Sequence, residues 1–220
     1  MADYAATRAR VEDYFDRTAT QTWERLTSDA PVSRIRQTVR EGRDRMRATM
    51  LARLPADLTG ARLLDAGCGP GVMTAELAAR GATVVAVDIA PQLLAIAEAR
   101  LPAAHRARVT FHAGDMTDAA HGAFDAVLAM DSLIYYGETD LLAALDRLSA
   151  RAPHVVFTVA PKTPLLTLMW GAGKLFPRAD RSPVMVPHAH RRLSARRTGL
   201  THIGRVARGF YISDCLEVRR

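Results

Sequence analysis

The chain has 220 residues, 49% of them hydrophobic and 24% charged, which suits one α/β domain with a sizeable core and argues against global disorder. Its two cysteines are too few for a disulfide framework and form no CxxC pair, so no metal site is expected. No run reaches the ~18 apolar residues of a membrane span, and the N-terminus lacks an apolar signal core, which together predict a protein of the reducing cytoplasm.

The formal net charge of +7 is unevenly distributed along the chain. Residues 1–150 contain 17 Lys and Arg against 20 Asp and Glu, whereas residues 151–220 contain 13 against 3. The basic part could face nucleic acid, an acidic membrane or an acidic small molecule, or it could be a solvated arginine-rich surface. Both interpretations stay open on charge alone.

The first 57 residues predict helices, because Val39, Met46 and Met50 recur at roughly helical spacing and no strand pattern appears. From residue 58 the pattern changes to alternating strands and helices, and the order predicts a mostly parallel sheet with helices on both faces. The predicted strands are 61–67, 82–88, 108–115, 123–131 and 154–161, and the helices are 72–81, 91–101 and 138–151. The alternating segment 201–220 predicts two antiparallel edge strands.

The strongest motif follows the first predicted strand and reads Asp65-Ala-Gly67-Cys68-Gly69-Pro-Gly71. Three glycines within five residues let the backbone approach a ligand closely, and the next helix offers unpaired N–H groups at its start. A dinucleotide fingerprint would need a sixth-position glycine, and the chain has valine there. The run instead matches the D/E-x-G-x-G-x-G pattern of methyltransferases, so these residues are predicted to bind S-adenosylmethionine.

Acidic residues at the ends of the next predicted strands extend this site. Asp88 with Ile89 ends the second strand and is placed to accept the ribose hydroxyls. Asp115-Met116 follows the third strand and is predicted to hold the adenine, and Met130-Asp131 ends the fourth. Each pair alone is a weak signal, but in parallel strands their carboxyl ends meet in one crevice at the switch point of the sheet. The interpretation is a Rossmann-like class I methyltransferase.

Several more particular blocks resemble the magnesium-protoporphyrin IX O-methyltransferases of chlorophyll and bacteriochlorophyll synthesis, almost end to end. They are Asp13-Tyr14-Phe15, Arg40-Glu-Gly42-Arg43, Met130-Asp131-Ser-Leu-Ile134-Tyr135-Tyr136, APKT at 160–163, KLFP at 174–177 and FYIS at 210–213. The resemblance implies transfer of a methyl group from S-adenosylmethionine to a propionate of magnesium protoporphyrin IX. It also implies cofactor contacts from Tyr14 and Arg43.

The same resemblance implies that residues 1–57 form a cap or lid on the methyltransferase domain 58–220, with a substrate-facing insertion near 161–191. The substrate would need apolar walls and cationic anchors for its second propionate, because Arg and Lys pair well with carboxylates. The expected substrate-binding residues are Lys162, Trp170, Lys174, Arg178 and Arg181. His188 or His190 could ligate the magnesium of the macrocycle, although an ordinary surface role is the preferred interpretation of both.

Two departures point to the bacteriochlorophyll branch. Oxygenic members of the family have Ile-His-Tyr where this chain has Ile134-Tyr135-Tyr136, and an aromatic residue where it has Thr27. A histidine-based mechanism therefore does not carry over to position 135. None is required, because a carboxyl group with a pKa of ~4.3 is already ionised at neutral pH. Tyr135 and Tyr136 are instead expected to orient the carboxylate by hydrogen bonds, as the catalytic residues.

Two other functions remain open on the sequence. Methylation of a quinone or another small apolar acid would use the same cofactor half. A module binding RNA or a membrane surface would use the basic C-terminal part, but the stretch 188–208 has no aromatic residue for base stacking, so no nucleic-acid partner is expected. Peripheral attachment to the intracytoplasmic membrane, and hand-over of substrate from the magnesium chelatase complex, are expectations that follow from the resemblance and the charge.

Overall fold

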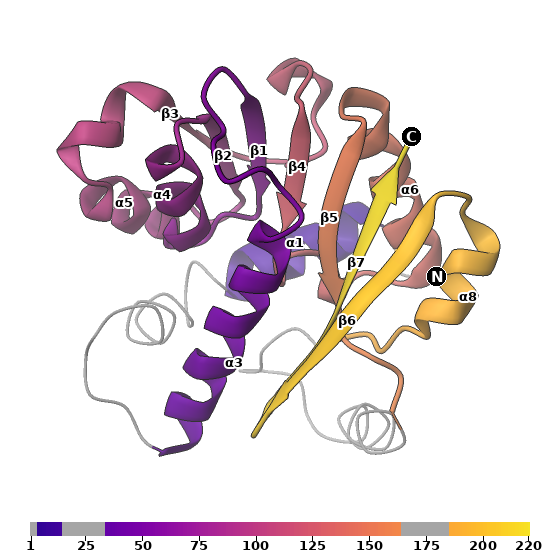
Figure 1. Ribbon diagram of the computed structural model, residues 1–220. Coiled ribbons are helices and arrows are strands. Elements are labelled where there is room, and N and C mark those ends of the chain that lie inside the picture. Colours follow the sequence, from indigo (N-terminus) through magenta and orange to yellow (C-terminus); the bar gives the residue numbers. More distant parts are fainter. Residues whose placement is uncertain (1–3, 15–33, 164–184) are drawn as a thin grey trace.

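The computed structural model describes residues 4–14, 34–163 and 185–220 (Figure 1). Its centre is a seven-stranded sheet with the order β3-β2-β1-β4-β5-β7-β6. The strands are β1 (Arg62–Ala66), β2 (Thr83–Asp88), β3 (Val109–Ala113), β4 (Ala126–Ala129), β5 (His154–Val159), β6 (Leu200–Arg208) and β7 (Tyr211–Arg219). The order reverses between β1 and β4, which is where doubly wound sheets bind their ligands.

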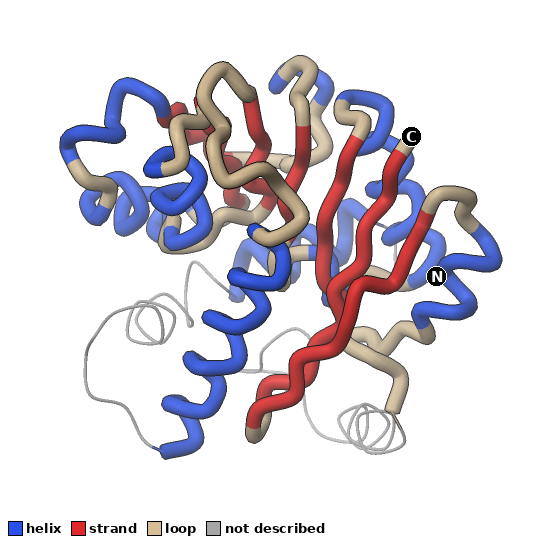
Figure 2. The backbone as a smooth tube through the Cα atoms, in the orientation of Figure 1, coloured by secondary structure: helices blue, strands red, loops and turns tan. Residues whose placement is uncertain are grey.

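Strands β1 to β5 run parallel, and the C-terminal hairpin supplies the antiparallel pairing. β7 lies between β5 and β6 and pairs antiparallel with both, so only β6 is an edge strand on that side (Figure 2). The predicted antiparallel strands are thus confirmed, with β7 inside the sheet. This arrangement carries Tyr211, the first residue of β7, to the part of the molecule where β5 ends.

Helices cover both faces of the sheet, as βαβ connections require. The α-helices are α1 (Tyr4–Tyr14), α3 (Arg34–Leu51), α4 (Val72–Ala79), α5 (Pro91–Arg100), α6 (Glu138–Arg151) and α8 (His190–Arg196). Within the described residues, the 3₁₀ helices are η2 (Ala103–Arg108), η3 (Ala119–His121) and η4 (Leu133–Tyr135). Among the residues placed by the structure, no helix is long and apolar enough to cross a bilayer.

The alternation of side chains along the strands builds two cores. Leu63 of β1 points to the face covered by α3 and α4, whereas Leu64 points to the face covered by α6 and α8. Both leucines are at most 1% exposed, so the central strands read as continuous apolar runs, as expected for a sheet buried on both sides. This sandwich fixes the strand ends that carry the predicted acids.

Helix α3 belongs to the packed body of the molecule. Its Met46 and Met50 are fully buried on the sheet, and the helix contacts β6 and β7 (Figure 1). The structure agrees with the helices predicted for 1–57 where it describes that segment. Helix α8, by contrast, was not predicted, because HRRLSAR has one apolar side chain besides its alanine and shows no helical face.

Candidate functional site

A cavity of about 340 Å³ lies at the C-terminal ends of the parallel strands, a volume in the range of small-molecule sites. Its wall combines the loop after β1, the ends of β2 and β4, the segments after β3 and β4, and side chains of α1 and α3. Predicted cofactor residues that line it are Asp65, Gly67, Cys68, Gly69, Asp88, Ile89, Asp115, Met116, Met130, Asp131 and Arg43. The crevice predicted from strand ends is therefore a real cavity.

The three glycines of the loop after β1 all have positive φ, but they differ in what surrounds them. A Cβ on Gly67 would lie 2.3 Å from Cβ of Ser132, and one on Gly71 would lie 2.7 Å from Cβ of Ala97. Both glycines are thus needed for packing within the protein. A Cβ on Gly69 would meet nothing within 4 Å, although Gly69 lines the cavity. Its backbone is open to a ligand, which fits a nucleoside cofactor in this place.

Asp65 and Asp88 lie side by side at the ends of β1 and β2. Asp65 is 1% exposed and accepts a hydrogen bond from Thr74 Oγ1 at 2.5 Å, and burial raises the pKa of its carboxyl to about 7. Asp88 accepts the backbone N–H of Gly69 at 2.7 Å and that of Ala90 at 2.9 Å. Asp88 therefore braces the glycine loop from the floor of the cavity.

Asp115 joins helix α1 to the segment after β3. Tyr4 Oη donates to its Oδ1 at 2.9 Å, and Arg8 donates to its Oδ2 at 3.2 Å. The backbone N–H and the hydroxyl of Thr117 add two further bonds at 2.8 Å. Burial alone would raise the pKa of Asp115, but these donors outweigh it and the pKa is lowered. Asp115 is thus an ionised anchor for α1.

Asp131, which follows β4, is the one non-glycine residue with positive φ in the described part of the chain, at 56°. Such a strained conformation persists only where the surroundings fix it. Its carboxylate pairs with Arg43 of α3, accepts Tyr211 Oη at 3.1 Å, and accepts Thr158 Oγ1 at 3.1 Å. Three distant elements therefore hold this side chain in the cavity wall.

Tyr135 and Tyr136 both line the cavity and are 8% and 4% exposed. Burial raises the pKa of each phenol well above 10, and the charge of Asp131 adds to the effect on Tyr135. Tyr136 stacks on Tyr4 of α1 with ring centroids 4.8 Å apart. At neutral pH both hydroxyls keep their protons, so they can donate hydrogen bonds but cannot act as bases.

Other predicted residues lie elsewhere. Tyr14 is not in the cavity wall and packs beside it, against the cluster of Val11 and Tyr135. Gly71 starts α4 behind the wall, and Lys162 is exposed outside it. Cys68, by contrast, belongs to the cavity wall; it is buried, and burial raises the pKa of its thiol, which fits packing. Trp170, Lys174, Arg178 and Arg181 lie outside the described residues.

His188, a candidate magnesium ligand, is 4% exposed, and its Nε2 lies 2.9 Å from the backbone carbonyl oxygen of Tyr136. Burial lowers the pKa of this ring, so the neutral form donates to the carbonyl. This hydrogen bond ties the segment around His188 to the backbone of the tyrosine pair. The surface role preferred for His188 from the sequence is therefore wrong: the residue is buried, and its role is structural.

Among the residues that hold the acids of the site, sequence reasoning missed Tyr4 and Arg8, which bind Asp115, and Thr158 and Tyr211, which bind Asp131. Each comes from an element remote from the glycine motif, and a tyrosine, arginine or threonine outside a motif gives no local signal of its partner. Tyr211 could have been singled out through the FYIS block, but its contact with Asp131 depends on β7 lying beside β5.

Two family models match the chain. One, described as "Methyltransferase domain", matches residues 63–151, and the other, described as "Magnesium-protoporphyrin IX methyltransferase C-terminus", matches residues 129–220. The first covers the glycine loop and the acids of the cavity. The second covers Asp131, the tyrosine pair and the C-terminal hairpin.

Individual relatives agree with these matches. The chain is 62% identical to the magnesium-protoporphyrin O-methyltransferase of Rhodobacter capsulatus over 99% of both chains. It is 30% identical to the enzyme of the same name from Synechocystis, over 96% of this chain and 95% of that one. The crystal structure of the Synechocystis enzyme with bound S-adenosylhomocysteine superposes with a TM-score of 0.79 at 28% identity, covering 97% of this chain and 99% of that one.

Proposed function

The chain belongs to the magnesium-protoporphyrin O-methyltransferase family, and from this we propose that it methylates a propionate carboxylate of magnesium protoporphyrin IX. The observation that carries the proposal is the 62% identity over 99% of both chains with a relative of that name. Quinone methylation and RNA binding are disfavoured, because the match to the family's C-terminal model spans residues 129–220, beyond the general methyltransferase part.

The residues of the cavity fit S-adenosylmethionine, which supplies an electrophilic methyl group on a sulfonium. The open backbone at Gly69 gives room for the nucleoside, and Asp88 beneath it can accept ribose hydroxyls. Met116 and Met130 offer apolar contacts in the wall. Arg43 can pair with the carboxylate of an amino-acid moiety. Solved structures of the Synechocystis relative with the cofactor and its demethylated product support this assignment.

Tyr135 and Tyr136 are proposed to orient the substrate carboxylate. The carboxylate is ionised at neutral pH, so the reaction needs alignment of oxygen, methyl carbon and sulfur but no general base. A phenol with the ordinary pKa of ~10 is already protonated at neutral pH, and burial raises the pKa of both phenols further, so both can donate hydrogen bonds to a carboxylate. Precise alignment of this kind can be worth ~7–11 kcal/mol.

The rest of the substrate is proposed to lie against the insertion near 161–191. Support comes from its two described ends, which run beside the tyrosine pair. Val186 N–H donates to the Ile134 carbonyl oxygen at 2.8 Å, and His188 N–H donates to that of Ala160 at 2.8 Å. The chain therefore leaves and returns next to the catalytic segment. Within residues 1–57, helix α1 is proposed as the lid, since Tyr4 and Arg8 reach the cavity from it, whereas α3 brings Arg43 to the cavity as part of the packed body.

Two partners are proposed beyond the substrate. The charge of +7 and a macrocycle of low solubility favour peripheral contact with an acidic membrane, testable by sedimentation with lipid vesicles. An apolar product of the preceding magnesium insertion is also best passed on without release to water, which favours a transient complex with the chelatase. Co-purification of the two proteins in the presence, but not the absence, of porphyrin tests that complex.

The first experiment is a mass-spectrometric assay of the purified chain with S-adenosylmethionine and magnesium protoporphyrin IX. We expect a gain of one ester-linked methyl group. Metal-free protoporphyrin and a quinone acid are the controls. If the chain binds the cofactor but yields no methylated porphyrin, its assignment as a methyltransferase would stand and the proposed substrate would be refuted.

Replacement of both tyrosines tests their role. We expect Tyr135→Phe combined with Tyr136→Phe to lower kcat by about 10²-fold or more, because two positioned donors are lost, with the cofactor affinity nearly unchanged. The phenyl rings keep the stacking on Tyr4, so the fold should survive. Tyr14→Phe, which packs outside the wall, is the matched control. Unchanged turnover of the double variant would remove these residues from the mechanism.

A further inference from the structure

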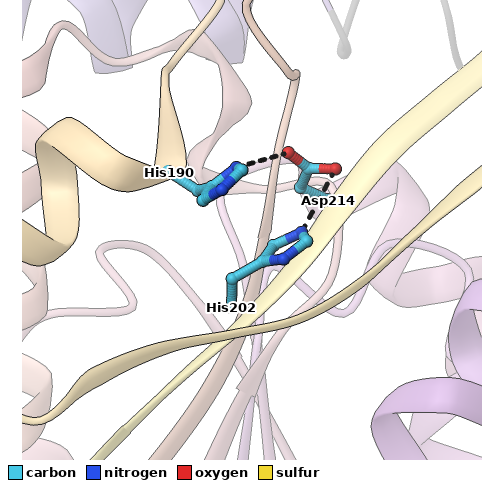
Figure 3. A group of neighbouring side chains, drawn as sticks. All are labelled: His190, His202 and Asp214. Atoms are coloured by element: carbon cyan, nitrogen blue, oxygen red, sulfur yellow. Dashed lines mark ion pairs between the residues drawn. The ribbon is translucent and has the colours of Figure 1, made fainter.

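A second group of polar side chains lies near the edge of the sheet, away from the cavity. His190 starts α8, His202 lies on β6 and Asp214 on β7, and none of the three lines the cavity (Figure 3). Both rings turn a nitrogen towards the carboxylate, as Figure 3 shows. The rings stack with centroids 4.1 Å apart. Three elements thus bring two imidazoles and a carboxylate to one point.

The separations match those within a metal coordination sphere. Nδ1 of His190 lies 3.6 Å from Asp214 Oδ2, and Nε2 of His202 lies 3.5 Å from Oδ1. Ligands at roughly 2.0–2.2 Å from a tetrahedral zinc ion are about 3.4 Å apart. The three ligand atoms all lie within 4.8 Å of one another, so small side-chain rotations suffice to surround an ion.

The group also has unused capacity to bind. Nε2 of His202 is buried, and its contact with Asp214 Oδ1 at 3.5 Å is too long for a good hydrogen bond. Asp214 is fully buried and ionised, with Arg205 donating to both of its oxygens at 2.6 and 2.9 Å. A carboxylate has about four acceptor positions, so one per oxygen remains on the side of the histidines. A buried nitrogen with so weak a contact to the carboxylate is costly unless an ion or another group binds between them.

We propose that His190, His202 and Asp214 bind one divalent transition-metal ion of the zinc type. Two imidazole nitrogens and a carboxylate oxygen suit Zn²⁺ or Co²⁺, with water completing the sphere, whereas Mg²⁺ prefers oxygen ligands in an octahedron. The site is separate from the magnesium of the substrate and from methyl transfer. It would join the end of the insertion, through α8, to the β6–β7 hairpin.

The test uses the untagged, full-length chain after treatment with a chelator. Co²⁺ is added and its visible d–d absorption is followed, with Zn²⁺ competition and elemental analysis for stoichiometry. We expect one equivalent of Co²⁺ with a tetrahedral-type spectrum, displacement by Zn²⁺, and a rise in Tm with the metal. Failure of the chain to take up the ion would overturn the site.

Variants locate the ion. His190→Gln and His202→Gln should each weaken Co²⁺ binding by more than about 100-fold, while the exposed His112→Gln on β3 should not. Unchanged binding in either ligand variant would place the ion elsewhere and refute the proposal. Circular dichroism checks that each variant folds.

Discussion

Asp65 shows how a single buried carboxyl group affects stability. Its folded-state pKa is about 7 because of burial, against 3.8 for the ordinary group. Between these pH values the folded chain binds one proton more than the unfolded chain, so the free energy of unfolding falls as the pH rises. The stability contributed by the protonated form is complete at the acid end of this window and lost as the pH passes about 7.

We therefore expect the unfolding free energy of the parent chain to fall by about 3 kcal/mol between pH 5 and pH 8 because of Asp65. In Asp65→Asn this part of the fall should be absent. Urea unfolding of both proteins at the two pH values measures it. The exposed Asp125→Asn is the control and should keep the slope of the unsubstituted chain. Parallel pH profiles for Asp65→Asn and the parent would mean that Asp65 is ionised throughout.

The two glycines Gly67 and Gly69 allow packing and cofactor binding to be separated. Alanine costs about 1–2 kcal/mol at either position because φ is positive, and only at Gly67 does the new Cβ also collide with Ser132. We expect Gly67→Ala to lower Tm strongly. Gly69→Ala should lower Tm by only a few degrees but weaken S-adenosylmethionine binding by about tenfold or more. Thermal scans and titration calorimetry measure both, and equal losses in the two variants would contradict this division.

At the scale of elements, the contact between α3 and β7 connects a helix to the cavity. A Cβ on Gly42 would lie 2.7 Å from the ring of Tyr211, whose hydroxyl holds Asp131. Helix propensity alone favours alanine over glycine by about 1 kcal/mol. The sign of the change in unfolding free energy in Gly42→Ala therefore tests whether propensity or the clash with Tyr211 prevails. The helix must sit closely on the strand for Tyr211 to reach Asp131.

We expect Gly42→Ala to destabilise the protein by about 1–3 kcal/mol and to lower kcat, because the tyrosine ring must move. Arg45→Ala on the exposed side of α3 keeps the helix propensity high and serves as control. Chemical denaturation and the methyl-transfer assay give the two readouts. A more stable Gly42→Ala variant would show that Tyr211 has space to shift.

The elements also show what could be predicted from the sequence. Local patterns predicted β1 to β5 and helices α4, α5 and α6, because buried strands and glycine or proline boundaries leave local signals. Because the carboxyl ends of parallel strands meet at one edge of the sheet, the sequence also correctly predicted that Asp65, Asp88, Asp115 and Asp131 lie together. The contacts of Tyr211 and Thr158 with Asp131 depend on β7 entering the sheet beside β5, and no local pattern encodes that insertion. The spacing of His190, His202 and Asp214 likewise matches no ligand motif.

At the scale of the whole molecule, folding redistributes the uneven charge. Arg208 pairs with Glu41, Arg197 with Asp146, and Arg192 and Arg196 both pair with Glu138. Arginines of residues 151–220 thus pair with acidic residues of 1–150. The charge count along the sequence treats these two parts separately and does not show this pairing. Exposed pairs of this kind contribute little to stability, but they reduce the local positive field. The net charge of +7 remains to attract an acidic surface.

We therefore expect the protein to bind vesicles of acidic lipid, and to dissociate when salt rises from about 0.05 M to about 0.5 M, because the Debye length shrinks below the separation of the charges. Neutral vesicles should not bind it, and retention on them would indicate apolar insertion instead.

The matched pair Arg191→Glu and Arg106→Glu then locates the contact. Both arginines are exposed and both variants change the charge equally, but Arg191 lies in α8 beside β6 and Arg106 in η2 beside β3, at opposite ends of the sheet. If the basic C-terminal part faces the membrane, Arg191→Glu should weaken binding by roughly tenfold or more in a flotation assay, and Arg106→Glu by much less. Equal losses would mean that the net charge, rather than a defined face, determines the attraction.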